Sequence, residues 1–249
     1  MRKPNFENLL KVLRREEPDR PTLFEFSLNG TLYKQLAGPE IANMNDDMAE
    51  VRTLVYAFMN AGYDYVNMIV SEFGFPKKPH NQLKTRSLND NATILDRKSF
   101  ENYPWPNPDD FDYSILGKIE DILPDGMKVI VRGRGGVLEN VIDLVGYDNL
   151  CYMLVDDPEL VQDIFDAVGS RFVRYYEICA SYESVGAIIS NDDWGFKTQT
   201  MLSPEALRRY VIPWHKKIVQ AAHKVGKPAI LHSCGNLELV MDDIIDEIQ

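Results

Sequence analysis

The sequence predicts an α/β fold, specifically a (β/α)8 barrel, for one domain that spans residues 1–249. Three observations favour this fold: short apolar runs with the character of buried strands, amphipathic helices between them, and glycines that separate each long helix from the next strand. A doubly wound sheet has the same alternation, but no G-x-G-x-x-G motif follows the first strand. We therefore expect a barrel of parallel strands.

Five short apolar runs have the length and composition of strands that are buried on both faces. They are TLFEF (22–26), YDYVNMIV (63–70), MKVIVR (127–132), GAIIS (186–190) and PAILH (228–232). A barrel has eight strands, and the sequence ends within an apparent helix, VMDDIIDEIQ. We therefore expect a barrel that lacks its C-terminal strands in this chain. Because such a barrel leaves strand edges open, we also expect self-association, for example as a homodimer.

The helices are marked by residues that begin or interrupt them. Asn5, Asp157 and Ser203 each precede a stretch with apolar residues at helical spacing, and their side chains are suited to capping a helix N-terminus. A proline follows Asp157 and Ser203 directly, at the first helical position, where it is tolerated. Pro213 lies inside the last of these helices and should kink it or split it in two.

Composition and charge limit the class of protein. The chain has a formal net charge of −11 and is 45% hydrophobic, which is ordinary for a globular domain but disfavours a nucleic-acid or anionic-membrane surface. The N-terminus has no long apolar stretch, and three scattered cysteines are too few for a disulfide framework. We therefore expect a cytoplasmic protein that binds neither nucleic acid nor membrane.

The motif HSCGN follows the strand at 228–232 and carries the most specific chemistry. Active sites of barrels lie at the carboxyl ends of the strands. His232 and Cys234 are two residues apart, so their side chains point to the same side, and an imidazole nitrogen and a thiolate sulfur can share one zinc ion. The alternative is a packed histidine beside an inert thiol, because this pair supplies only two ligands.

The other strand ends supply further candidates. Asn191, Asp192 and Asp193 follow one strand, where Asn191 could bind a substrate. The two acids could act as catalytic acid and base, orient a substrate or position a metal-binding imidazole, or the segment could be a solvated Asx-turn. Arg132 and Arg134 lie in RGRGG, where guanidinium and amide groups favour a carboxylate or phosphate, although a flexible turn would have the same composition. In SEFGFP, Glu72 could reach the barrel mouth as a substrate-binding residue or lie on the surface.

Four segments together resemble the uroporphyrinogen decarboxylase superfamily. They are EPDRP near the N-terminus, GGVLENVIDLVGYDNLCYMLVDDPELV, NDDWGFKTQTMLSPEALRRYVIPWHKKIV and GKPAILHSCGNLELVMDDII. The resemblance covers nearly the whole chain, and it implies a (β/α)8 barrel, in agreement with the repeat pattern.

Two branches of this superfamily differ in chemistry. Members of one branch decarboxylate uroporphyrinogen III without metal or cofactor and carry RQAGRY-type and FSDIL-type motifs, where this sequence reads FEFSLNGTLYKQL and MIVSEFGFP. Members of the other transfer a methyl group from a methylated corrinoid to a thiol and bind zinc through an H-x-C pair and a distant cysteine. His232 and Cys234 match that pair, and the resemblance implies a third protein ligand beyond Gln249.

The resemblance thus implies a zinc-dependent methyltransferase that uses a methylated corrinoid, with a corrinoid carrier protein as a partner. Two alternatives stay open at this point. One is decarboxylation of uroporphyrinogen III, and the other is a non-catalytic barrel that binds a corrinoid or another tetrapyrrole.

Overall fold

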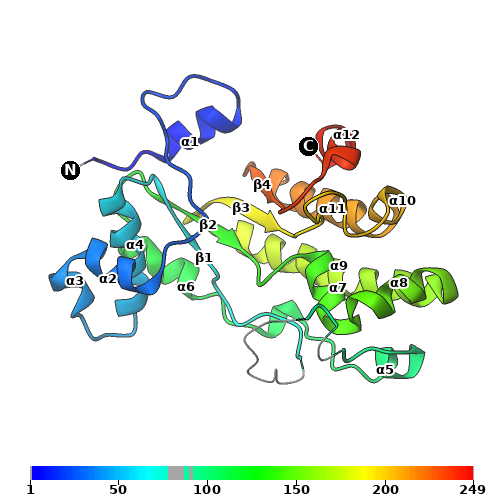
Figure 1. Ribbon diagram of the computed structural model, residues 1–249. Helices are drawn as coiled ribbons and strands as arrows, with labels where there is room; N and C mark the ends of the chain where they lie inside the picture. The colour runs from blue at the N-terminus through cyan, green and yellow to red at the C-terminus, as the bar shows by residue number, and fades with distance from the viewer. Residues whose placement is uncertain (1, 78–86, 90–91, 249) are drawn as a thin grey trace.

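A parallel sheet lies at the centre of the computed structural model, which describes residues 2–77, 87–89 and 92–248 (Figure 1). Its four strands follow one another in chain order: β1 (Tyr65–Met68), β2 (Lys128–Arg132), β3 (Val185–Asn191) and β4 (Ala229–His232). Neighbouring strands pair in parallel. The predicted α/β fold with parallel strands is confirmed. Over the described residues, the sheet is a partial barrel that hydrogen bonds do not close, with β1 and β4 at its edges.

The predicted strand at 22–26 is wrong. In the structure this segment is not hydrogen-bonded into the sheet, because the side chain of Tyr65 takes the place of a backbone partner. The Tyr65 hydroxyl accepts a hydrogen bond from the Glu25 amide (2.6 Å) and donates one to the Glu25 carbonyl (2.8 Å). The segment therefore lies beside β1 and brings Phe26 to the carboxyl end of the sheet, where its ring contacts Arg132 and His232.

The helices flank the sheet and connect its strands (Figure 1). Among the described residues, four helices precede β1, two lie between β1 and β2, and the others follow β2. Their bounds are α1 (Phe6–Leu13), α2 (Gly30–Ala37), α3 (Pro39–Ala42), α4 (Ala49–Ala61), α5 (Arg97–Glu101), α6 (Ile115–Lys118), α7 (Val137–Val145), α8 (Tyr147–Asp156), α9 (Pro158–Ala180), α10 (Pro204–Ala206), α11 (Ile212–His223) and α12 (Met241–Asp243). Among these, α9 and α11 pack on each other and contact β3, so they cover one face of the sheet.

The predicted helix starts are confirmed at all three capping residues. The side chains of Asn5, Asp157 and Ser203 accept hydrogen bonds from backbone amides in the first turns of α1, α9 and α10. The predicted kink or split at Pro213 takes the form of a π-helical turn just before this residue, and the chain stays helical through it. A π-helical turn at Leu207–Val211 separates α10 from α11, and Pro213 lies in the first turn of α11, where its missing N–H costs no helical hydrogen bond.

The N-terminal segment covers the amino ends of the strands. Before β1, the buried Asp64 accepts hydrogen bonds from the Asn5 amide (2.8 Å) and from the Arg20 guanidinium. The ring of Phe6 lies against Gly186 at the start of β3, so closely that a Cβ there would come within 2.5 Å of it. The EPDRP motif, which contains Arg20, therefore anchors the chain at the end of the sheet opposite to HSCGN.

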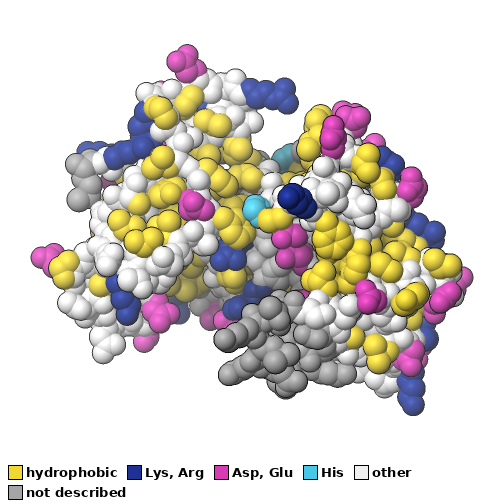
Figure 2. Space-filling model, in the orientation of Figure 1, with side chains coloured by type: hydrophobic (Ala, Val, Ile, Leu, Met, Phe, Trp, Pro, Cys, Tyr) yellow, Lys and Arg dark blue, Asp and Glu magenta, His cyan; other side chains and the backbone are white. Residues whose placement is uncertain are grey.

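None of the helices among the described residues combines the length and apolar character that a membrane crossing requires. On the face drawn in Figure 2, acidic and basic side chains are interspersed with hydrophobic ones rather than gathered into one patch of either charge.

Candidate functional site

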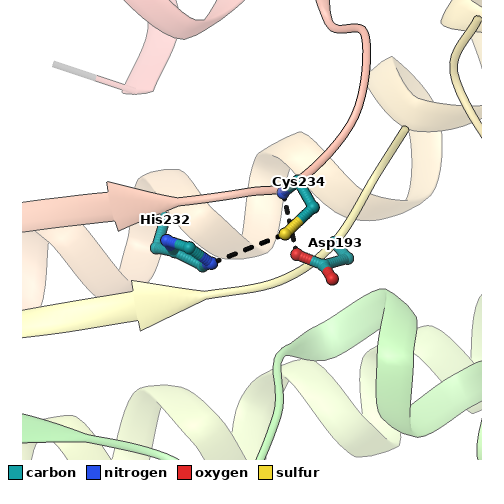
Figure 3. Close-up of side chains that lie close together, drawn as sticks. All are labelled: Asp193, His232 and Cys234. Atoms are coloured by element: carbon teal, nitrogen blue, oxygen red, sulfur yellow. Dashed lines mark hydrogen bonds between the residues drawn. The ribbon is translucent and has the colours of Figure 1, made fainter. Parts of the chain in front are cut away.

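Three potential metal ligands meet where β3 and β4 end (Figure 3). Asp193, His232 and Cys234 each offer one ligand atom, and these atoms lie within 4.8 Å of one another. The Cys234 sulfur is 3.8 Å from Nε2 of His232, and the Cys234 amide donates to Oδ1 of Asp193 (2.8 Å). His232 and Cys234 are exposed and Asp193 is partly buried, so a small ligand can reach all three. The structure thus brings the H-x-C pair together with one of the two predicted acids.

Backbone hydrogen bonds hold the two loops of this cluster together. The Asp192 amide donates to the His232 carbonyl (2.9 Å), and the Gly195 amide donates to the Cys234 carbonyl (3.2 Å). Gly235 has a φ of +88°, and a Cβ on it would lie 2.1 Å from the Gly195 carbonyl oxygen. A glycine is therefore required after Cys234, because any side chain would push the two loops apart.

The donor set of this cluster fits a zinc ion. Three protein ligands drawn from imidazole, thiolate and carboxylate, with one position left for a substrate, are typical of catalytic zinc. A hydrogen bond to Asp193 raises the pKa of the Cys234 thiol, because the carboxylate stabilises the protonated form. A bound cation would reverse this preference and favour the thiolate.

Asp192 does not face this cluster, and its predicted role as a catalytic residue is corrected. Its carboxylate is fully buried on the helix-covered side of the sheet, where it accepts hydrogen bonds from the amides of Leu138 (2.8 Å) and Glu139 (2.9 Å) at the start of α7. Nε2 of His215 on α11 lies 2.9 Å from the same carboxylate. Since all these partners belong to the protein, Asp192 fixes α7 and α11 to β3 and is closed to a substrate.

The last glycine of RGRGG, Gly136, serves this same connection. A Cβ on Gly136 would lie 2.1 Å from Cβ of Asp192, so only glycine lets α7 begin against that carboxylate. Arg134 is exposed, and it pairs with Glu72 at 2.8 Å. Over the described residues, neither side chain of this pair forms a hydrogen bond or ion pair with the Asp193–His232–Cys234 cluster. The structure therefore places the predicted substrate-binding residues Arg134 and Glu72 in a surface ion pair.

The side chains of Arg132, Asn191 and His232 lie on the face of the sheet opposite to α11. We call this face the inner face. The strand register pairs Arg132 with Ile189 and Asn191 with His232, and side chains two residues apart on a strand share a face. The guanidinium of Arg132 lies over the ring of Phe26, 4.9 Å from its centroid, and the same ring stacks on His232 at 4.8 Å. The contribution of Phe26 was not evident from the sequence, because it comes from a segment that resembled a strand.

Glu139 is a second residue that sequence patterns did not single out. It lines a cavity of about 360 Å³ together with Asp193. Burial, and then the nearby charge of Asp192, raise its pKa to about 7. One feature of the sequence could have identified Glu139: it lies three residues after Gly136, which is the spacing of a capping box. In the structure its carboxylate accepts a hydrogen bond from the Gly136 amide (2.9 Å).

Comparisons with known proteins identify a family and a shared fold. Residues 93–247, which include all three residues of the cluster, match the family described as uroporphyrinogen decarboxylase (URO-D). Among solved structures, a methyltransferase from Methanosarcina mazei superposes with a TM-score of 0.62 at 16% sequence identity, over 97% of this chain and 73% of that one. A comparison with curated protein sequences found no match.

Proposed function

Because the chain belongs to the uroporphyrinogen decarboxylase family, we propose that it is a methyltransferase in which zinc, held by His232, Cys234 and Asp193, prepares a substrate thiol to accept a methyl group from a methylated corrinoid. The observation that carries this proposal is the convergence of the three ligand atoms within 4.8 Å at two adjacent strand ends. The fold shared with a methyltransferase from Methanosarcina mazei supports it.

The protein's own residues would hold and orient the reacting thiol. When bound, zinc would lower the pKa of that thiol, so that the nucleophilic thiolate is present near neutral pH. Stacking on Phe26 fixes the plane of the His232 ring, and the Gly195–Cys234 backbone bond fixes the sulfur relative to Asp193. In the transfer, the carbon–sulfur bond forms as the carbon–cobalt bond breaks. The bonding electron pair stays on cobalt, and the thiol proton passes to solvent.

Zinc analysis tests the ligand set. We expect the purified chain to retain zinc after dialysis, and His232→Ala or Cys234→Ala to weaken zinc binding by more than about 100-fold in a chelator competition. Changes to groups that only orient a ligand typically cost about 10–100-fold, and Asp193→Asn should exceed that range if Asp193 is a true ligand.

The matched control for this titration is Cys151→Ala. Cys151 is partly exposed but lies on α8, so its removal should leave zinc binding unchanged. Equal loss of zinc from the Cys151 and Cys234 variants, or retention by both, would contradict the proposed centre.

Activity assays separate methyl transfer from its alternatives. Methylation of 2-mercaptoethanol by methylcobalamin, lost in Cys234→Ala, would support the proposal. Conversion of uroporphyrinogen III without metal would indicate a decarboxylase instead. Binding of cobalamin without turnover in the zinc-loaded protein would indicate a non-catalytic corrinoid-binding barrel.

A further inference from the structure

Among the described residues, no group forms a hydrogen bond with Nδ1 of His232, the ring nitrogen that does not face Cys234. A metal-binding histidine usually donates this second nitrogen to a carboxylate, a carbonyl or water, and that bond fixes the plane of the ring. Nε2 of His232 lies 3.8 Å from the Cys234 sulfur, and the side chain is exposed (Figure 3). Another contact therefore has to hold the ring for Nε2 to stay directed at the sulfur.

The ring of Phe26 supplies that contact. Its centroid lies 4.8 Å from that of the His232 imidazole, and the two planes are inclined by 27°, which is a stacked arrangement. The Arg132 guanidinium lies over the same Phe26 ring, 4.9 Å from its centroid. Arg132 and His232 are the last residues of β2 and β4, and β3 separates these strands, so the ring bridges two strands that are not neighbours. Two partners thus restrict how the Phe26 ring can turn.

Hydrogen bonds on both sides of Phe26 hold the backbone that carries it. Before Phe26, the Tyr65 hydroxyl accepts from the Glu25 amide (2.6 Å) and donates to the Glu25 carbonyl (2.8 Å). After it, the Leu28 amide donates to the Tyr33 hydroxyl (2.8 Å). Tyr65 is fully buried, so this anchor is itself fixed. The segment therefore delivers the Phe26 ring from a held backbone, although it belongs to no sheet.

We propose that Phe26 is a positioning residue of the metal centre, whose ring holds the His232 imidazole in the plane that directs Nε2 at the Cys234 sulfur. Stacking favours one plane of the imidazole and leaves both of its nitrogens free, so Nε2 stays available to an ion. The inference rests on the proposed function in one respect, namely that His232 is a zinc ligand. The stacking itself needs no metal and can be tested without one.

Two phenylalanines of one segment provide matched variants for zinc binding. Phe24 lies two residues before Phe26, is 48% exposed and contacts the ring of Tyr65 rather than that of His232. In a chelator competition, Phe26→Ala should weaken zinc binding by about 10–100-fold, which is the usual loss when a group that orients a metal ligand is removed. Phe24→Ala should leave zinc binding unchanged. An equal loss in both variants, or no loss in Phe26→Ala, would overturn the proposal.

Two conservative variants separate stacking from simple coverage of His232. Phe26→Tyr keeps the flat ring and should bind zinc as tightly as the unaltered chain. Phe26→Leu keeps an apolar side chain but has no flat face, so it should show most of the loss seen in Phe26→Ala. A leucine variant that matches the unaltered chain would mean that Phe26 only covers His232, and the positioning role would be wrong. Circular dichroism checks the fold of each variant.

Proton NMR of the zinc-free chain tests the stacking directly, even if a variant is unfolded. The chain has four histidines, and His232→Ala and His223→Ala assign the two imidazole signals that are compared. At pH 9, well above the ordinary imidazole pKa of about 6.5, both rings are compared in one protonation state. The Phe26 ring shields the protons of the imidazole stacked on it, so the His232 signals should lie upfield of those of His223, which is exposed on α11. Coincident signals would overturn the proposal.

The positioning role and the proposed function fail in different experiments. If the unaltered chain holds no zinc, the proposed centre is wrong, and the NMR comparison alone decides whether Phe26 orients His232. If the unaltered chain and Phe26→Ala bind zinc equally well, the centre stands and the positioning role is wrong.

Discussion

Asp192 and Asp193 are neighbours in the sequence that serve opposite sides of the sheet. Ser190 and Asp192 point toward α11, where both contact the buried His215, whereas Asp193 points toward Cys234. An ionised Asp192 can only accept, so Nε2 of His215 donates to it, and Nδ1 of a neutral imidazole then accepts from the Ser190 hydroxyl. One acid therefore stabilises the fold and its neighbour belongs to the candidate centre.

We predict that alanine substitutions separate these two roles. Asp192→Ala should lower the free energy of unfolding by about 3–5 kcal/mol, because it removes one partner of a buried hydrogen-bonded pair. Asp193→Ala should cost only about 1 kcal/mol, for the lost Cys234 amide bond, but should abolish tight zinc binding. Urea denaturation and zinc titration of both variants measure this, and similar unfolding energies for the two would contradict the assignment.

We predict a pH-dependent gain in stability for Glu139→Gln. The Glu139 pKa is about 7 in the folded chain, against an ordinary value of 4.5, chiefly because the carboxylate is buried. Below pH 4.5 the side chain is protonated in both states and contributes no difference. As the pH rises from 4.5 to 7, only the unfolded chain releases the proton, so the wild type loses on the order of 2–3 kcal/mol that the glutamine variant keeps.

Urea denaturation at pH 4.5 and pH 8 checks this prediction. The side-chain oxygen of the glutamine can still accept a hydrogen bond from the Gly136 amide. The capping interaction is therefore kept, and the two proteins differ only in the ionisable group. If the free energies of unfolding of the two proteins differ by the same amount at both pH values, ionisation of Glu139 is not the cause.

At the scale of single residues, strand alternation decides which side chains meet. Asn191, Asp192 and Asp193 lie at the end of a predicted strand. Because successive side chains of a strand point to opposite faces, Asp192 should point away from the face that Asn191 and Asp193 share. This signal was available before the structure.

At the scale of elements, the start of α7 depends on glycine. We predict that Gly136→Ala lowers the free energy of unfolding by more than about 3 kcal/mol, because the new Cβ would lie 2.3 Å from the Asn191 carbonyl oxygen and displace α7 from Asp192. Gly117→Ala on α6 is the control. Nothing lies within 4 Å of its Cβ position, so alanine should be neutral or stabilise by about 0.5–1 kcal/mol. Comparable losses in both variants would refute the steric argument.

Elements whose signals are local were predicted well, and those that depend on distant contacts were not. The caps at Asn5, Asp157 and Ser203 act within one helical turn, so the sequence pattern sufficed. The segment at 22–26 has the composition of a strand, but Tyr65, 40 residues away, takes up the polar groups of Glu25. No local pattern encodes that contact, so the composition of the segment alone favoured a strand.

At the scale of the whole molecule, the candidate centre and the ion pair of Asp64 with Arg20 lie at opposite ends of the strands. The candidate centre lies at the carboxyl ends of the strands, where barrel enzymes place their active sites. The buried Asp64, Arg20 and the N-terminal segment occupy the amino ends. The two ends should therefore respond independently to substitution.

We predict that Arg20→Gln destabilises the chain without affecting zinc. Asp64 is 2% exposed, and the Arg20 guanidinium is its hydrogen-bonded cation, whereas the nearest Arg2 nitrogen is 3.7 Å away. Without Arg20, the buried carboxylate of Asp64 still accepts a hydrogen bond from the Asn5 amide, but its negative charge is largely uncompensated. The free energy of unfolding should therefore fall by about 3 kcal/mol. Urea denaturation should show this loss, and zinc affinity under native conditions should match that of the unaltered chain. A parallel loss of zinc affinity in this variant would show that the two ends of the sheet are coupled.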